Sequence, residues 1–434
     1  MGVALGLWIW ACGANAADPG AVPRTVILIS IDTLRADHLG CYGYAHPTTP
    51  YLDRFREDAV QFTQAIAASN STLTSHASMM TSLLVQQHGA AFARHLALSS
   101  RFLTVAGVFR QHGYRTVSFN DGGMLAAEYG IGNGFDVYRS SRPTLRFHFA
   151  PIVDQAIAWL DAHPRGPLFL FLHTYEVHHP YTPDPRYLAL MEPPYHGALP
   201  AAETDMPTLI AINEGRLPAG PRDRAHVVAT YDGEIRSMDE AFGRLISFLE
   251  RQGRYDPALI VFTADHGEEF GEHGVMGWHG HTLYDELLRV PLLVKFPYGA
   301  HAGLTVASQV RGIDVAPTLV AALGWPQPEQ FRGADLTPLV RGQSPIPRLA
   351  VSKFDTRPDT SIRTGAWKLY DGRLYDLRGD PGETRDVAAQ HPEVAAFLTR
   401  RLRALVAERP ASAGPKVELT GEERERLRSL GYLP

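Results

Sequence analysis

Three short apolar runs in this chain end abruptly in acids or histidines, and this pattern restricts the fold more than any other feature. The runs cover residues 25–31, 168–173 and 258–262, and each has the length and the β-branched or aromatic content of a buried strand. Runs that are apolar at nearly every position are typical of parallel strands covered by helices on both faces. Ligands of such sheets bind outside the carboxyl ends of the strands. The pattern therefore predicts an α/β fold with a site at one edge of the sheet.

The polar residues that follow these runs are of types that bind divalent metals. Asp32 follows the first run, Glu176 and His178 follow the second, and Asp265 with His266 follows the third. Carboxylate and imidazole ligands together favour zinc or manganese, whereas a set of oxygens alone favours calcium. An ordinary helix cap at Asp32 and solvated loop charges near residue 265 are the competing interpretations. Because three strand ends carry matching chemistry, we expect Asp32, Asp265 and His266 to share a metal ion.

The segment SNSTLTSH, residues 69–76, is dense in hydroxyl groups and precedes a predicted helix at residues 77–84. Such residues are common helix caps, and that interpretation suits Thr74 or Ser75. A helix amino terminus also offers free N–H groups to an anionic substrate. A hydroxyl group there that contacts a metal ion can act as a nucleophile.

The rest of the chain alternates between helix and strand patterns up to about residue 345. Residues 182–221 are rich in proline, glycine and alanine, and we interpret them as a long loop beside the substrate cleft. From residue 346 the pattern changes to short strands, with Asp371-Gly372 as a two-residue hairpin turn. We therefore predict a catalytic domain at 24–345 and a small carboxy-terminal α+β subdomain at 346–434, with an antiparallel sheet and helices.

The amino-terminal residues 1–16 have the features of a secretory signal peptide. Val3–Trp10 is apolar but too short to span a bilayer, and Ala14-Asn15-Ala16 is a cleavage signal. Trp10 makes the sequence before Cys12 a poor lipobox, so a lipid anchor is the less favoured alternative. Cleavage after Ala16 would leave Cys41 as the only cysteine, which excludes a disulfide within one chain. These features predict a periplasmic or secreted protein without a stable membrane span.

The charge of the chain argues against one class of partner. The net charge is -5 and the pI is near 6.4, so there is no basic field for binding nucleic acid. The sequence does not specify an oligomeric state.

Six segments in order resemble the sulfatase family of the alkaline phosphatase superfamily. They are ISIDTLRADHLG, SNSTLTSHASMMTSLL, HTYEVHHPY, TADHGEEFGEHG, HGHTLYDELLRVPLLV and LYDLRGDPGETRDV. The resemblance implies a large mixed, mostly parallel sheet sandwiched by helices, and metal-assisted hydrolysis of a small anionic ester through a covalent intermediate.

The same resemblance implies roles for individual residues. Asp32, Asp265 and His266 match metal ligands, and Thr72 matches the nucleophile, which also binds the metal. His178 and His281 match residues that contact the ester oxygens or the leaving group. Glu176, His279 and His76 are further candidates at less specific positions. One or two ions are expected, with zinc or manganese favoured and calcium possible.

Four positions depart from the usual sulfatase pattern. Thr72 replaces the cysteine or serine that is converted to formylglycine, and the following proline and arginine are absent. Thr33 replaces a second acid, His266 replaces an asparagine or glutamine, and no sulfate-gripping Gly-Lys is recognisable near residues 112–124. These changes resemble superfamily members in which a threonine acts on phosphate or phosphonate esters.

The sequence therefore predicts a sulfatase-family hydrolase of sulfate or phospho-esters, and the residues favour the phospho-ester. One alternative is a transferase that passes the group on Thr72 to an alcohol. Another is a binding protein that keeps the fold without catalysis.

Overall fold

The computed structural model describes residues 23–141, 147–343, 348–355, 357–408 and 414–432, so the predicted signal peptide lies outside the described residues. Within these ranges the main sheet has nine strands in the order β10-β2-β9-β6-β1-β5-β3-β4, with β11 also paired to β2. The strands are β1 (Thr25–Ile31), β2 (Val60–Ile66), β3 (Arg115–Asn120), β4 (Val137–Ser140), β5 (Leu168–Thr174), β6 (Leu259–Ala264), β9 (Arg289–Lys295), β10 (Thr305–Val306) and β11 (Val310–Arg311).

The centre of this sheet is parallel. Strand β1 pairs in parallel with β5 on one side and with β6 on the other, and all three are buried along their whole length. Strand β9 runs antiparallel between β2 and β6. The prediction of a large mixed, mostly parallel sheet is confirmed.

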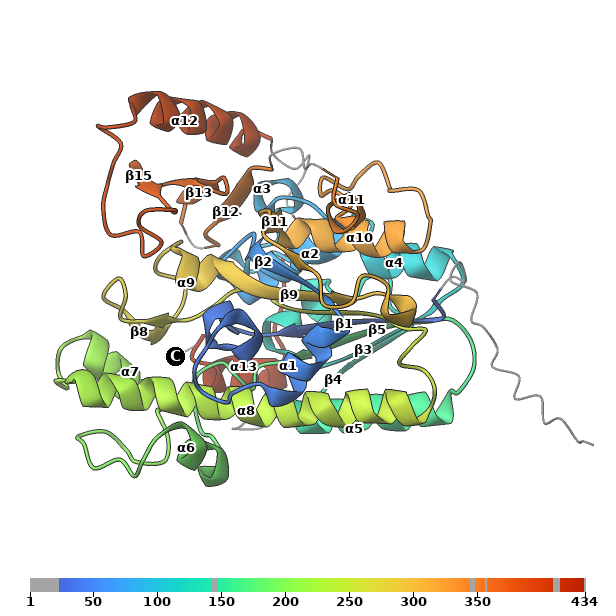
Figure 1. The fold of residues 1–434 in the computed structure, drawn as a ribbon, viewed down its shortest axis with the longest axis horizontal. Coiled ribbons are helices and arrows are strands. Elements are labelled where there is room, and N and C mark those ends of the chain that lie inside the picture. The colour runs from blue at the N-terminus through green and yellow to red at the C-terminus, as the bar shows by residue number, and fades with distance from the viewer. Residues whose placement is uncertain (1–22, 142–146, 344–347, 356, 409–413, 433–434) are drawn as a thin grey trace, which may run out of the picture.

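Helices cover both faces of the sheet (Figure 1). One face carries α1 (Pro50–Glu57), α5 (Phe149–Ala162) and α8 (Pro221–Arg251), and the other carries α2 (Thr72–Thr81), α4 (Val105–Gln111) and α10 (Val315–Ala322). The long helix α8 presents Val227, Ile235 and Met238 to the core, at the spacing of one helical face.

A small antiparallel sheet follows the main sheet along the chain. Its strands are β12 (Ala350–Lys353), β13 (Thr360–Arg363), β14 (Trp367–Tyr370) and β15 (Arg373–Asp376), and α12 (Pro392–Val406) packs on it. Asp371 and Gly372 both have positive φ, as the predicted two-residue hairpin requires. The buried Lys368 joins this sheet to the main body, because its ammonium lies 3.0 Å from Asp285 and 2.9 Å from Glu383.

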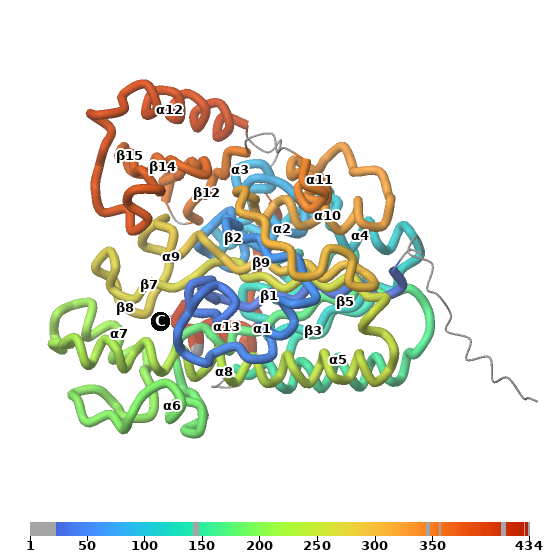
Figure 2. The backbone as a smooth tube through the Cα atoms, in the orientation of Figure 1, coloured from blue at the N-terminus to red at the C-terminus, as the bar shows by residue number. Residues whose placement is uncertain are grey.

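The last described helix returns to the main body. Helix α13 (Gly421–Ser429) contacts the 3-10 turn η4 (Gly123–Leu125), whereas α12 stays with the small sheet (Figure 2). Leu427 and Leu430 anchor this return, since both side chains are fully buried. Further short elements include α3 (Val85–His88), α9 (Asp285–Leu288), α11 (Thr337–Val340), β7 (Glu269–Phe270) and β8 (Met276–Trp278).

The interpretation of residues 182–221 as a continuous loop is wrong. The segment contains α6 (Pro185–Met191) and α7 (Met206–Asn213), and α6 packs against α8. Each helix starts after an aspartate cap, because Asp184 accepts a hydrogen bond from Arg186 N and Asp205 accepts one from Thr208 N. A proline in the first turn of each helix strengthens these starts.

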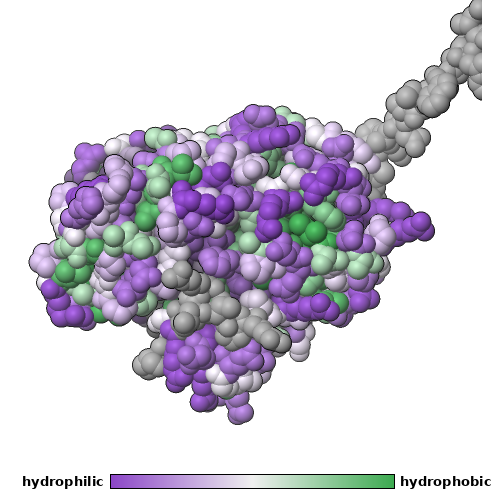
Figure 3. All heavy atoms as spheres, turned by 90° about the horizontal axis from the view of Figure 1, so that it is seen from below, coloured by the Kyte–Doolittle hydropathy of each residue, from purple (hydrophilic) through white to green (hydrophobic). Residues whose placement is uncertain are grey.

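The surface seen from below is mostly hydrophilic, with small hydrophobic patches separated by polar residues (Figure 3). Among the described helices, none combines the length and the apolar character needed to cross a bilayer.

Candidate metal centre and active site

Strand register brings the first two predicted ligands together. Ile31 at the end of β1 pairs with Ala264 at the end of β6 and with Thr174 at the end of β5. Asp32 and Asp265 are the next residues on their strands, so they lie side by side at the carboxyl edge of the sheet. One ligand atom from each of Asp32, Asp265 and His266 lies within 4.8 Å of the others. The edge therefore holds a compact set of side chains of the types that bind divalent metals.

In each of the two carboxylates, one oxygen is hydrogen-bonded and the other has no hydrogen-bond partner. Asp265 Oδ1 accepts hydrogen bonds from His266 N at 2.9 Å and Thr33 N at 3.3 Å. Asp32 Oδ2 lies 3.2 Å from His173 Nε2. Asp265 Oδ2 and Asp32 Oδ1 are buried without a hydrogen-bond partner. A buried oxygen without a partner costs free energy, and a cation bound between these two oxygens would remove that cost.

His266 is oriented in the same way. Its Nδ1 donates to the carbonyl oxygen of Gly267 at 3.0 Å, which leaves Nε2 buried without a hydrogen-bond partner. A second-shell hydrogen bond of this kind fixes the tautomer and the ring direction of a metal-ligating histidine. The ring is fully buried. The donor set therefore fits a divalent ion that accepts imidazole.

Among the hydroxyl groups at the start of α2, only that of Thr72 lacks a partner. Thr74 Oγ1 donates to Ser69 Oγ at 2.7 Å, and Ser75 Oγ donates to the carbonyl oxygen of Asp265 at 2.7 Å. Thr72 Oγ1 is fully buried and has no partner within hydrogen-bond distance, but it lies near enough to Asp32 for its hydroxyl to lower the pKa of that carboxyl. Helix α2 begins at Thr72 and not at residue 77, so Thr72 lies in the first turn, with Ser71 as the N-cap residue.

Burial and mutual repulsion dominate the electrostatics of this edge. Burial raises the pKa of Asp32 to about 7, while His266 and the hydroxyl of Thr72 lower it in part. Burial and the neighbouring Asp32 also raise the pKa of Asp265. Burial lowers the pKa of His266, but the two carboxylates outweigh that effect and the net shift is upward. A bound cation would relieve the repulsion between the carboxylates.

Two histidines behind the ligands support them. His173, on β5, lies against Asp32 and is fully buried. His76 occupies the position where sulfatases carry an arginine, and both of its ring nitrogens are used, by the Thr72 carbonyl at 2.8 Å and by Ser30 Oγ at 3.0 Å. His76 therefore holds the turn that carries Thr72. His173 was not among the residues predicted from the sequence, although its place near the end of β5 is a usable signal.

A second buried cluster adjoins the first. One ring nitrogen from each of His178, His179 and His279 lies within 4.8 Å of the others, and the ring of His279 is 4.6 Å from that of His266. Glu268 lies 3.1 Å from His279 Nδ1. Burial raises the pKa of Glu268, but His279 and His179 outweigh it and bring the pKa to about 2.

The hydroxyl of Tyr432 links two histidines of this cluster. It lies 2.7 Å from His178 Nε2 and 2.8 Å from His279 Nε2. His178 Nδ1 donates to the carbonyl oxygen of His179, and His279 Nδ1 donates to the Glu268 carboxylate. In the neutral rings both Nε2 atoms are therefore acceptors, and the single proton of the phenol serves one of them at a time. No local pattern in the sequence points to Tyr432, because it is separated from both histidines by more than 150 residues.

Two other candidates lie apart from these clusters. Glu176 accepts from Phe149 N at 2.8 Å and from Ser237 Oγ at 2.6 Å, so its carboxylate faces helices α5 and α8. His281 is more exposed and lines a cavity of about 410 Å³ beside Ser71, His279 and Tyr432. The structure thus places His279 against the predicted ligand His266 and His178 against His279, whereas His281 lines the cavity.

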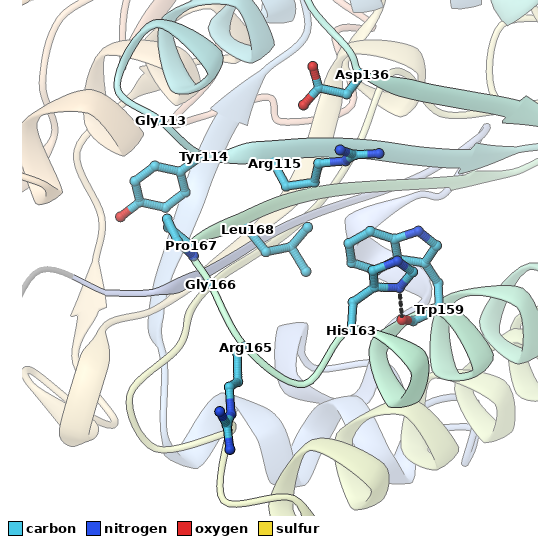
Figure 4. A pocket seen from close by; sticks show the side chains of 10 residues that line it. All are labelled: Gly113, Tyr114, Arg115, Asp136, Trp159, His163, Arg165, Gly166, Pro167 and Leu168. Atoms are coloured by element: carbon cyan, nitrogen blue, oxygen red, sulfur yellow. Dashed lines mark hydrogen bonds between the residues drawn. The ribbon is translucent and has the colours of Figure 1, made fainter.

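A larger cavity is unrelated to this edge. It has a volume of about 460 Å³ and lies at the amino ends of β3 and β5, where Trp159 and His163 stack beside Arg115 and Leu168 (Figure 4). Since ligands of parallel sheets bind at the carboxyl ends, the edge with Asp32 is the better candidate site.

Comparison with known protein families gives two matches along the chain. The model of the sulfatase family matches residues 24–325. A model described as the carboxy-terminal part of N-sulphoglucosamine sulphohydrolase matches residues 271–408.

Individual relatives include sulfatases and phospho-ester hydrolases. The chain is 26% identical over 348 residues to an ulvan-active sulfatase of Formosa agariphila, covering 74% of this chain but only 65% of that protein. It is 26% identical to the multifunctional alkaline phosphatase superfamily protein PehA of Trinickia caryophylli, covering 74% of this chain and 78% of that one. The crystal structure of a phosphonate monoester hydrolase of Agrobacterium radiobacter has the same fold, with a TM-score of 0.73 and 21% identity over 88% of this chain and 95% of that chain.

Proposed function

The chain belongs to the sulfatase family and is a hydrolase of sulfuric or phosphoric esters, and we propose that within this class it is a metal-dependent phosphate or phosphonate ester hydrolase that uses Thr72 as nucleophile. The observation that carries this proposal is the set of four buried atoms without partners: Asp32 Oδ1, Thr72 Oγ1, Asp265 Oδ2 and His266 Nε2. A hydroxyl group among unsatisfied metal-ligand atoms suits nucleophilic catalysis better than a structural role.

Because residue 72 is a threonine and not a formylglycine, we expect a phospho-ester to be the preferred substrate. Formylglycine arises from cysteine or serine, and threonine is not converted to it. An unmodified hydroxyl can attack phosphorus directly and form a phosphothreonine-type ester. The relatives include sulfatases as well as a phosphonate monoester hydrolase of the same fold, so the proposed preference for a phospho-ester rests on Thr72.

The proposed reaction has two displacements. Thr72 Oγ attacks phosphorus, the bond from phosphorus to the alcohol oxygen breaks, and the alcohol takes up a proton. Water then attacks phosphorus, the bond to Thr72 Oγ breaks, and phosphate or phosphonate is released. A bound divalent ion would lower the pKa of the Thr72 hydroxyl and neutralise charge on the non-bridging oxygens.

The histidines have separate proposed roles. His281 lines the cavity beside Ser71, so we assign to it the proton for the leaving alcohol. His178 is already hydrogen-bonded to Tyr432, so we assign to it the orientation of groups beside the ester.

We propose one ion, held by Asp32, Thr72, Asp265 and His266. The imidazole ligand favours zinc or manganese over calcium. A second ion among His178, His179 and His279 would compete with the Tyr432 hydroxyl, which already contacts Nε2 of two of them. We also propose a periplasmic or secreted location, which rests on residues 1–16.

Ion affinity should fall as the pH drops below neutral. The pKa of Asp32 is raised to about 7, and that of Asp265 is raised as well, so below pH 7 the ion must displace protons. We expect the affinity to fall about tenfold or more for each pH unit below 7 and to level off above it. A chelator should therefore lower the melting temperature more at pH 8 than at pH 5.5, as calorimetry can measure. An equal effect at both pH values would contradict proton displacement at this site.

The function itself is tested by measuring the metal content of the purified protein and its turnover of four p-nitrophenyl esters. These are the sulfate, the phosphate, the phenylphosphonate and a phosphodiester. We expect about one zinc or manganese ion for each chain, and faster turnover of a phospho-ester than of the sulfate. Turnover of the sulfate alone would overturn the substrate preference, and a metal-free, inactive protein would favour the binding-protein alternative.

A further inference from the structure

Tyr432 is held in the active site by a defined local structure. The turn after α13 places Gly431 at φ +76°, a conformation that favours glycine, and Tyr432 N donates to the carbonyl oxygen of Leu427 at 2.8 Å. The preceding Leu430 is fully buried and packs with Phe147 and Tyr175. The backbone that carries Tyr432 is therefore fixed on both sides of the turn, and its phenol reaches the histidine cluster for a structural reason.

The ring of Tyr432 forms one wall of the 410 Å³ cavity that opens beside Ser71. The other walls include the rings of Phe92, Trp278 and Phe354, and the ring centroids of Phe92 and Tyr432 are 5.5 Å apart. This volume is within the range of small-ligand sites. The cavity thus leads from the residue next to Thr72 into a space bounded by aromatic rings.

The charges of the residues that line this cavity do not favour a polyanionic ligand within it. The described residues that line it include no lysine and no arginine, and the one acid is Asp355. Arg94, Lys353 and Arg357 line a neighbouring cavity of about 630 Å³ instead. A sugar with several sulfate groups needs basic partners, whereas an uncharged flat ring gains from contact with aromatic faces.

From these contacts we propose that Tyr432 is a specificity-determining residue that selects esters whose alcohol part is an uncharged flat ring. This inference rests on the proposed function, because the ester group must lie at Thr72 for its alcohol part to enter the cavity. In this arrangement the ring of the alcohol packs against Tyr432 and Trp278. The Tyr432 hydroxyl, which contacts Nε2 of both His178 and His279, keeps these two rings beside the ester. The phenol ring thus contributes to selection, and the hydroxyl contributes to positioning.

The two contributions separate in binding and kinetic measurements on the ion-loaded protein. Benzylphosphonate and ethylphosphonate are non-hydrolysable mimics of a phenyl ester and a methyl ester. By titration calorimetry we expect the wild type to bind benzylphosphonate about tenfold or more tightly than ethylphosphonate. Tyr432→Ala should reduce this ratio to about threefold or less, and Tyr432→Phe should keep it while lowering kcat, because only the hydroxyl is lost.

Two further variants test whether the effect of Tyr432→Ala comes from the lost ring or from a disturbed fold around α13. Trp278→Ala removes an aromatic wall without touching α13, and it should also reduce the ratio. Tyr298→Phe changes an exposed tyrosine that does not line the cavity, and it should leave the ratio and kcat unchanged. If Tyr432→Ala does not fold, as judged by circular dichroism, Trp278→Ala and Tyr432→Phe together still decide the proposal.

The outcomes for this inference and for the proposed function differ. Binding that prefers benzylphosphonate and depends on Tyr432, in a protein that hydrolyses no phospho-ester, would support the ring pocket and overturn the proposed function. Hydrolysis of phospho-esters with equal binding of the two mimics, unchanged by Tyr432→Ala or Trp278→Ala, would overturn the ring pocket alone.

Discussion

Replacing Thr72 by alanine is expected to lower kcat by roughly 10⁴- to 10⁶-fold, because the proposed covalent step loses its nucleophile. The change removes one oxygen and one methyl group from a fully buried position at the start of α2. Asp32, Asp265 and His266 remain, so the protein should still bind an ion, although less tightly. The measurement is kcat for the fastest p-nitrophenyl ester, together with metal content and a melting curve.

Thr72→Ser is the matched control for this prediction. Serine keeps the hydroxyl and should retain activity within about 100-fold of the wild type. Thr74→Ala removes a neighbouring hydroxyl that is already hydrogen-bonded to Ser69, and it should leave kcat close to the wild-type value. The nucleophile would be wrongly assigned if Thr72→Ala kept its kcat while Thr74→Ala or Ser75→Ala lost it.

Asp265→Asn is expected to lower both ion affinity and activity, the latter by about 10³-fold or more. An asparagine oxygen can still accept from Thr33 N and His266 N, so the backbone there should keep its geometry. The amide nitrogen, however, would replace Asp265 Oδ2, which is one of the unpartnered atoms. An N–H group repels a cation, and the site also loses a negative charge. Metal content after dialysis and kcat/KM measure the two effects.

Asp239→Asn is the control for Asp265→Asn, because it makes the same change at a buried aspartate outside the proposed metal site. Burial raises the pKa of Asp239 to about 7, the same value as for Asp32, but both of its oxygens accept from backbone N–H groups, of Leu52 at 2.8 Å and Tyr51 at 3.0 Å. This variant should lose about 1–3 kcal/mol of stability, because one backbone donor is left without its acceptor. Its metal content and kcat/KM should stay near wild type. Loss of the ion in both variants would show that general destabilisation, and not ligand loss, explains Asp265→Asn.

The sheet could be predicted from sequence because its central strands are apolar on both faces. Strand β1 has the predicted bounds, and β5 and β6 differ from the predicted runs by one or two residues at their ends. The helices α6 and α7 were missed because proline and alanine content was given more weight than local start signals. Asp184-Pro185 and Asp205-Met206-Pro207 are such signals, since an aspartate cap followed by proline in the first turn favours a helix.

The part of the candidate site that lies at strand ends could be predicted from the sequence. Asp32 and Asp265 follow paired strand positions, so their closeness follows from the parallel arrangement alone. The contact between Tyr432 and His279 depends on how the chain returns after the small sheet, which no periodic pattern encodes. The loop from residue 279 to residue 281 offers two histidines, and only the folded backbone decides that His279 faces the cluster while His281 lines the cavity.

The in-register ends of β1, β5 and β6 limit how this chain can change length. Side chains alternate between the two faces of a strand, so deletion of one residue inside β1 would exchange its faces and move Asp32 away from Asp265. Insertions between the strands carry no such penalty, because loops at the surface absorb them. Variation in length among related chains should therefore concentrate in the connections, while the spans that precede Asp32 and Asp265 keep a fixed number of residues.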